Sequence, residues 1–190
     1  MKQGEKTKNY ILDESDKLFY KNGYSSTSFS DIVVATGLSK GNITYHFKNK
    51  QLILEAIIDR RLDNIKTQFS NWEKKEKNPK DRLLLFFDMI ISENQNIIDY
   101  GCPMGTLTAE FSKNEAKLYE ITIPMFKQYR NWLKQQFELI GFLSDEADIK
   151  AMSLLGQVQG IATVTHAFKD KEFLHIEIKK IKKELLQGQV

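Results

Sequence analysis

The sequence predicts an all-α protein built from about nine helices. Apolar residues recur at helical spacing in most segments, and no long stretch alternates apolar and polar residues as a half-buried strand does. The 190 residues include only three prolines, so few positions oppose helix formation. With 41% hydrophobic residues, the chain is long enough to bury a sizeable core in one or two domains.

The first predicted helix covers residues 6–22. Ile11, Leu12 and Phe19 fall on one of its faces, which indicates packing against a core. The Asn-Gly pair that follows is a common helix stop, so the chain turns there before the next segment.

Two short helices are predicted next, separated by three residues. Ser28 caps the first, and Asp31 stands three positions later as in a capping box. Gly37 suits the left-handed residue that ends a helix, and Ser39 then caps a second helix over residues 40–47. This arrangement is typical of a helix-turn-helix, whose second helix enters the major groove of DNA.

The residue types of the second short helix fit that task better than a solvated turn between core helices. Lys40 and Gly41 lie at its N-terminus, where free backbone N–H groups favour a phosphate. Ile43 and Phe47 are four apart and face the core. The outward positions carry side chains that can read base edges or bind phosphate, namely Asn42, Thr44, Tyr45 and His46.

The net charge of +3 is confined to the same part of the chain. Residues 1–50 contain eight lysines and five acidic residues, whereas residues 51–190 contain twenty basic and twenty acidic residues. A basic patch restricted to one segment is the electrostatic pattern of a phosphate-binding surface.

The run from Ile32 through ATGLSKGNITYHF to Lys50 and Leu52 resembles the N-terminal domain of TetR-family transcriptional regulators. The resemblance covers about residues 6–60 and implies a two-domain, all-helical homodimer in which a ligand domain controls DNA binding. Thr44 stands where many members carry Tyr, and it could reach a thymine methyl group or a base edge. By resemblance, positions that contact DNA are Thr27, Lys40, Gly41, Tyr45, His46 and Lys50; Ser28, Asn42 and Thr44 complete the predicted set.

The remaining helices are predicted at 50–72, 80–99, 103–111, 115–140, 144–168 and 171–187. Pro124 lies inside the fourth of these and predicts a kink or a break. We place a helix-turn-helix DNA-binding domain at residues 1–50 and a helical ligand-binding and dimerisation domain at residues 51–190. The helix over 50–72 begins in the first domain and reaches the second, which suits it to carry a conformational signal.

The second domain is expected to hold an apolar cavity with a few polar groups. Its predicted lining comprises Phe86, Met89, Phe111, Met125, Tyr129, Trp132 and Gln159, although each of these could equally be ordinary core. The resemblance places the dimer interface on the last two helices. The candidates there are the small residues Gly156, Gly160 and Thr163, with Ile178 and Ile181.

These features predict a sequence-specific transcriptional regulator, a repressor released from a palindromic operator in double-stranded DNA by a small-molecule effector of unknown identity. We find no catalytic constellation, cofactor motif or metal-ligand spacing, no apolar run long enough for a membrane, and no signal segment. The expected protein is therefore cytoplasmic and non-enzymatic, and the resemblance implies that it is a homodimer.

Two alternatives remain from the residues. Cys102 precedes Pro103 at a predicted helix N-terminus, a position that favours the reactive thiolate. Residues 101–105 also look like a stretch from a branch of the family that includes thiol sensors, so a repressor that senses electrophiles or oxidants is one alternative. A helical module that binds a protein partner through its basic face is the other.

Overall fold

The computed structural model describes residues 3–113 and 115–187, which form α-helices and no strand. This confirms the predicted all-α fold. The helices are α1 (Gln3–Asn22), α2 (Phe29–Thr36), α3 (Lys40–His46), α4 (Lys50–Lys75), α5 (Pro79–Ser92), α6 (Asn94–Tyr100), α7 (Pro103–Phe111), α8 (Ala116–Ile140), α9 (Ser144–Phe168) and α10 (Lys171–Leu186). None of these helices is long and apolar enough to cross a membrane.

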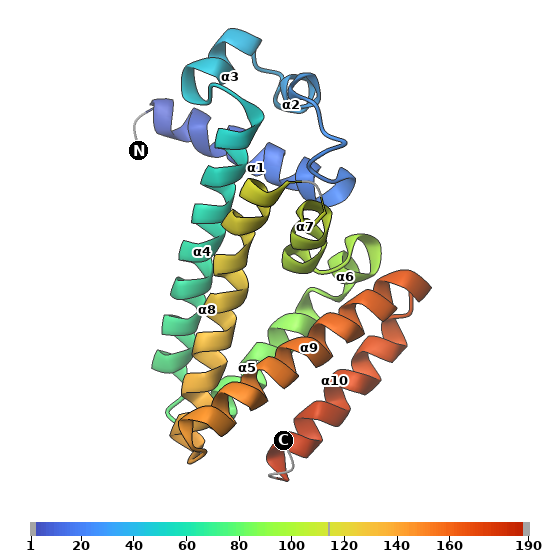
Figure 1. Ribbon diagram of the computed structural model, residues 1–190. Coiled ribbons are helices and arrows are strands. Elements are labelled where there is room, and N and C mark those ends of the chain that lie inside the picture. The colour runs from blue at the N-terminus through green and yellow to red at the C-terminus, as the bar shows by residue number, and fades with distance from the viewer. Residues whose placement is uncertain (1–2, 114, 188–190) are drawn as a thin grey trace.

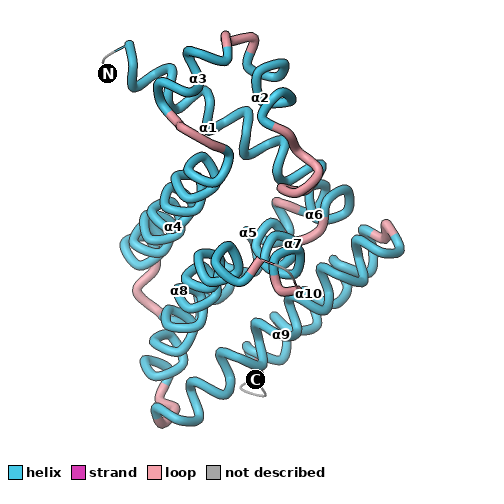
Figure 2. The backbone as a smooth tube through the Cα atoms, turned by 45° about the horizontal axis from the view of Figure 1, so that its top comes forward, coloured by secondary structure: helices cyan, strands magenta, loops and turns pink. Residues whose placement is uncertain are grey.

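Helices α1–α3 gather at one end of the molecule (Figure 1). From there α4 and α8 run side by side, α8 also packs on α9, and α10 packs on α9 and α5. The connecting loops are short (Figure 2). The long helices thus form a bundle that carries the three-helix unit at one end.

Apolar side chains are buried in two clusters. The first core joins α1–α3 and the start of α4, with Ile11, Ile32, Ile43 and Ile53 fully buried. It also takes in Leu107 and Phe111 of α7 and Leu118 and Met125 of α8. The second core joins the far end of α4 with α5, α8, α9 and α10. Because α7 and α8 contribute to the first core, the helix-turn-helix rests directly on the bundle.

The predicted helix boundaries around the helix-turn-helix are confirmed by their caps. The Ser28 hydroxyl accepts from the Asp31 N–H, and the Asp31 carboxylate accepts from the Ser28 N–H at 2.7 Å. Gly37 ends α2 at φ +65°, a left-handed conformation that a residue with a Cβ rarely adopts. Ser39 and Asn49 cap α3 and α4. These local signals fix where each short helix starts.

Two features differ from the sequence prediction. The helix expected over 80–99 breaks at Glu93 into α5 and α6. Polar side chains at the break bond to nearby carbonyl groups, Ser92 Oγ to Met89 and Asn94 Nδ2 to Ile91, and so compete with the helical pattern. Conversely, α8 runs on through Pro124 as one continuous helix, so the predicted break is wrong there.

Candidate nucleic-acid interface and ligand cavity

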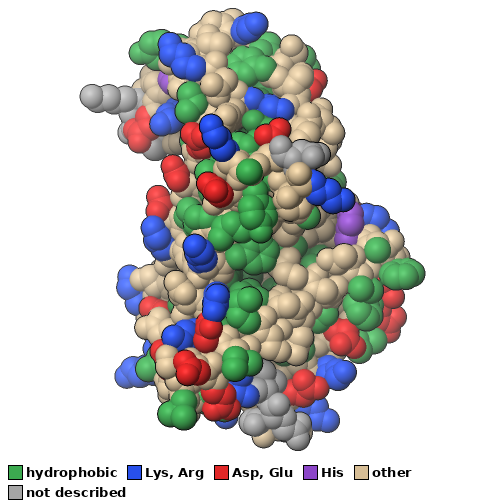
Figure 3. Space-filling model, in the orientation of Figure 1, with side chains coloured by type: hydrophobic (Ala, Val, Ile, Leu, Met, Phe, Trp, Pro, Cys, Tyr) green, Lys and Arg blue, Asp and Glu red, His purple; other side chains and the backbone are tan. Residues whose placement is uncertain are grey.

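Helix α3 exposes one polar face. Lys40, Gly41 and Asn42 are exposed at its N-terminus, and Tyr45 is 82% exposed. Ile43 anchors the opposite face in the first core with no exposure. Lysine side chains lie over the α1–α3 end on the face shown in Figure 3. A short helix fixed at its back, with free polar groups at its front, is the geometry that a major groove accepts.

The other predicted residues of the face are less free. Thr44 is half-buried, and its hydroxyl donates to the carbonyl groups of Lys40 at 2.9 Å and Gly41 at 3.1 Å. Its methyl group and the acceptor side of its hydroxyl oxygen are therefore the parts left for a base contact. His46 is half-buried with its ring edge-on to the Tyr45 ring. Ser28 is exposed, but its hydroxyl is already used as the cap of α2.

Two predicted contact residues are engaged within the chain. Thr27 is 1% exposed and its hydroxyl donates to the Gly23 carbonyl at 2.7 Å, so its side chain is not on the surface. The Lys50 ammonium donates to the carbonyl groups of Tyr24 and Thr27 at 2.7 Å each and lies over the Tyr24 ring. Burial lowers the pKa of Lys50. Both residues therefore brace the turn before α2, a role that the sequence did not indicate.

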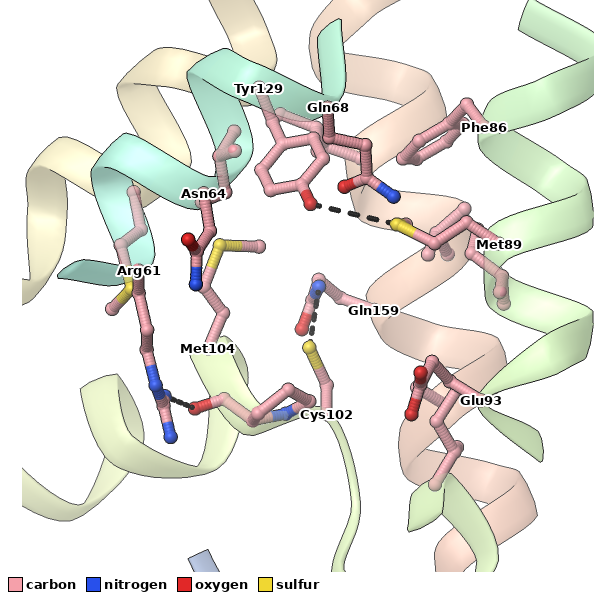
Figure 4. A pocket seen from close by; sticks show the side chains of 18 of the residues that line it. Arg61, Asn64, Gln68, Phe86, Met89, Glu93, Cys102, Met104, Tyr129 and Gln159 are labelled. Carbon is pink, nitrogen blue, oxygen red and sulfur yellow. Dashed lines mark hydrogen bonds between the residues drawn. The ribbon is translucent and has the colours of Figure 1, made fainter. Parts of the chain in front are cut away.

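A cavity of about 420 Å³ lies in the bundle between α4, α5, α7, α8 and α9 (Figure 4). Its volume falls in the range of small-molecule sites. Five of the predicted lining residues do line it: Phe86, Met89, Met125, Tyr129 and Gln159. Two do not. Phe111 packs in the first core against Tyr24, and Trp132 stacks on Phe69 while its indole N–H donates to Glu73.

Several lining residues were missed from the sequence: Tyr20, Arg61, Asn64, Gln68, Glu93 and Met104. Arg61, Asn64 and Gln68 stand three and four positions apart on α4, so they share one face with the apolar Ile65. That spacing was the available signal. We did not predict these residues as lining because they are polar, and a polar stripe on a long helix ordinarily faces solvent.

The wall of the cavity nearest the helix-turn-helix is built by α1 and α4. The Tyr20 hydroxyl reaches the carbonyl of Gly101 at 2.7 Å and that of Asn96 at 3.1 Å. Arg61 donates to the Pro103 carbonyl at 3.1 Å and pairs with Asp16 of α1. A helix of the DNA-binding unit thus contributes a side chain to the cavity and holds the α6–α7 connection.

Cys102 lies at the N-terminus of α7, as predicted, and caps that helix. It also lines the cavity, which was not predicted. Its sulfur accepts weak hydrogen bonds from the Gly105 N–H at 3.5 Å and from Gln159 Nε2 at 3.3 Å. Both contacts are hydrogen bonds from uncharged donors, and they hold the Cys102 side chain in place at the start of α7. Among the described residues, nothing favours the thiol-sensing alternative.

The predicted dimer surface divides in two. Gly156, Gly160 and Thr163 are exposed along α9. Ile178 and Ile181 are 0% and 4% exposed in the second core, so their side chains pack within the protomer, contrary to the prediction. The apolar stripe of α10 serves the protomer itself.

The fold and the exposed second helix define a helix-turn-helix DNA-binding protein with a ligand-sized cavity in its helical bundle. The family model for bacterial regulatory proteins of the tetR family matches residues 11–57, which cover most of α1, all of α2 and α3, and the start of α4.

Relatives match over nearly the whole length. An uncharacterised HTH-type transcriptional regulator of Lactococcus lactis is 28% identical over 171 residues, which cover 88% of this chain and 87% of that protein. The transcriptional regulator QacR of Staphylococcus aureus is 28% identical over 166 residues, or 84% and 86% of the two chains. The family model over the helix-turn-helix and these full-length relatives together support a DNA-binding transcriptional regulator of the TetR family.

A solved TetR transcriptional regulator from Legionella pneumophila shares the fold, with a TM-score of 0.82 at 24% identity. The match covers 92% of this chain and 94% of that one. The bundle and the helix-turn-helix therefore follow one common architecture.

Proposed function

We propose that the protein is a repressor that binds a palindromic operator as a homodimer and leaves it when a small molecule occupies the cavity between α4, α5, α7, α8 and α9. The observation that supports this is Tyr20, which belongs to α1 and lines the cavity. A ligand there meets a side chain of the DNA-binding unit directly. In this proposal residues 1–50 bind DNA and residues 51–190 bind effector and partner, with α4 shared.

The proposed DNA contacts fall into two groups. Lys40 and the free N–H groups at Gly41 bind phosphate, whereas Asn42, Thr44, Tyr45 and His46 meet base edges or the sugar-phosphate backbone. Thr27, Ser28 and Lys50 act mainly by fixing the turn and the start of α2, since Thr27 and Lys50 donate to carbonyl groups of the turn and Ser28 caps α2.

Release requires that the effector bind one dimer geometry better than the other. Two recognition helices must meet major grooves about one turn, or ~34 Å, apart. An effector that displaces the α6–α7 connection alters the contacts of Tyr20 and Arg61 with it, and hence the position of α1. A small rotation of each helix-turn-helix changes the distance between the two α3 helices, so that both can no longer enter their major grooves at the same time.

The proposed second chain packs on the exposed face of α9. That face combines Gly156 and Gly160 with the exposed apolar side chains Ile149 and Met152. Small residues let a second helix approach closely, and exposed apolar area favours its burial. We further propose that the protein acts in the cytoplasm, where its DNA is, and has no catalytic activity.

Binding to fragments of the protein's own promoter region, measured at several salt concentrations, tests this function. We expect affinity to fall steeply with salt and to exceed that for random DNA by at least ~10³-fold. A protein-interaction module would bind both DNAs equally weakly. Equal affinity for promoter and random DNA at every salt concentration would contradict the proposal.

A further inference from the structure

The polar groups of the cavity are not spread evenly. Asn64 and Gln68 project from α4, and Tyr129 projects from α8 beside them (Figure 4). Apolar side chains, among them Ile97, Leu155 and Val158, form much of the remaining lining, together with Gln159, whose Nε2 already donates to Cys102 Sγ at 3.3 Å. A molecule in this cavity would therefore meet Asn64, Gln68 and Tyr129 along the wall of α4 and α8, and a mostly apolar lining elsewhere.

Tyr129 is the buried member of that polar wall. Its side chain is 8% exposed, and its hydroxyl lies 3.8 Å from the sulfur of Met89, a weak acceptor. A buried hydroxyl without a good acceptor is costly, because it has given up its hydrogen bonds to water. Burial also raises the pKa of Tyr129, so the hydroxyl stays protonated and remains a donor. Among the described residues, this donor has only the weak thioether acceptor of Met89.

The charged groups around the cavity are already satisfied or lie in solvent. Arg61 pairs with Asp16 and donates to the Pro103 carbonyl. Glu93 is exposed, and one of its carboxylate oxygens accepts from Asn96 Nδ2 at 2.7 Å. An exposed carboxylate gains little from an ion pair, since water screens it. Neither a cation nor an anion would find a strong partner in the interior.

We propose that the effector is an uncharged, largely apolar molecule whose carbonyl or similar oxygen accepts a hydrogen bond from the Tyr129 hydroxyl, with the Gln68 carboxamide beside it. This deepens the proposed function, on which it rests, by giving the effector a chemical class. The apolar side of the cavity receives the body of the molecule, and the donor wall sets its orientation. Affinity then depends on one buried hydrogen bond added to apolar burial.

The test uses the full-length protein and the fluorescent aromatic ketone prodan, whose emission shifts when its carbonyl accepts a hydrogen bond. Two analogues serve as comparisons: one with a propyl group in place of the propionyl group, and one with a trimethylammonium in place of the dimethylamino group. The variants are Tyr129→Phe, Glu93→Gln and the control Tyr119→Phe, which removes an exposed hydroxyl from the same helix.

We expect wild type to bind the ketone better than either analogue. Tyr129→Phe should weaken ketone binding about tenfold, abolish the hydrogen-bond shift in emission, and leave binding of the propyl analogue unchanged. Tyr119→Phe should bind the ketone as wild type does, and Glu93→Gln should not change the low affinity for the trimethylammonium analogue. No ketone binding, binding insensitive to Tyr129→Phe, or preference for the cation through Glu93 would each overturn the proposal.

Promoter binding without probe is measured in parallel for the same variants. Wild type and Tyr129→Phe should bind operator DNA equally, since Tyr129 packs in the second core whereas α2 and α3 pack in the first. If promoter binding holds and the ketone result fails, only the effector class is wrong. If promoter binding itself is absent, the proposed function is wrong whatever the probe does.

Discussion

Glu110, next to the last residue of α7, accepts a hydrogen bond of 2.6 Å from the backbone N–H of Ser25, 85 positions earlier in the chain. The same carboxylate accepts from the Tyr24 N–H at 3.1 Å. The other end of α7, at Pro103 and Met104, lines the cavity. One helix about 13 Å long therefore joins the cavity wall to the turn that precedes α2.

The first prediction concerns this contact. Glu110→Ala should lower the free energy of unfolding by about 1–2 kcal/mol, because it removes two charge-assisted hydrogen bonds from a half-buried site. It should also weaken the link between cavity and DNA, so that an effector still binds but releases less DNA. Urea denaturation and effector titration of the DNA complex measure these two effects.

Glu120→Ala removes an exposed carboxylate of α8 and serves as the control. It should behave as wild type in both measurements. Normal release by Glu110→Ala would mean that α7 does not carry the signal to the helix-turn-helix.

The second prediction separates positioning from base reading within α3. Lys40→Ala should weaken binding to all DNA sequences alike and reduce the slope of affinity against salt by about one. Asn42→Ala should instead cost about 1–3 kcal/mol on the operator and little on random DNA. Lys180→Ala on the exposed face of α10 controls for loss of a lysine elsewhere. Equal losses on both DNAs for Lys40→Ala and Asn42→Ala would refute the division.

Lys50 provides a third prediction, in which the structure changes the expectation. From the sequence, Lys50→Ala should act like a phosphate contact. Because its ammonium holds two carbonyl groups and lies 4.0 Å from the centre of the Tyr24 ring, we now expect a loss of about 1–3 kcal/mol in unfolding free energy as well. Lys40→Ala should leave stability unchanged. If Lys50→Ala has normal stability but fails to bind DNA, the bracing role is wrong, and Lys50 binds phosphate as the sequence predicted.

The sequence could predict the helix-turn-helix closely because its signals are local. Ser28, Gly37 and Ser39 each act within a few residues through caps and a left-handed turn. A pattern read along the chain contains that information. The break at Glu93 was missed for the opposite reason, since two side-chain bonds to carbonyl groups outweigh an otherwise apolar, helical run.

The cavity could be predicted only in part because it is a tertiary feature. Trp132 and Met125 stand on the same helix and look alike in sequence, yet only Met125 lines the cavity. The packing of helices distant in sequence determines which face of α8 lines the cavity and which face packs on Phe69. The prediction that Ile178 and Ile181 lie in the dimer interface was wrong for the same reason. An apolar stripe on a helix packs equally well against the same chain or against another chain, and here it packs within the protomer.

The last prediction uses Gly156 to detect the second chain. A Cβ added at Gly156 meets no atom within 4 Å in the protomer, and the position is exposed in the middle of α9. Gly156→Ala should therefore stabilise the isolated chain by about 0.5–1 kcal/mol, because alanine favours a helix over glycine. If a second copy packs closely on this face, the same methyl group falls between the two helices and weakens the dimer.

Sedimentation over a range of concentrations measures the affinity of the dimer, and urea unfolding of the dissociated protein measures the stability of the single chain. We expect opposite signs: a more stable protomer and a weaker dimer. A variant that dimerises as wild type does would place the dimer interface away from Gly156, whatever its effect on the stability of the chain.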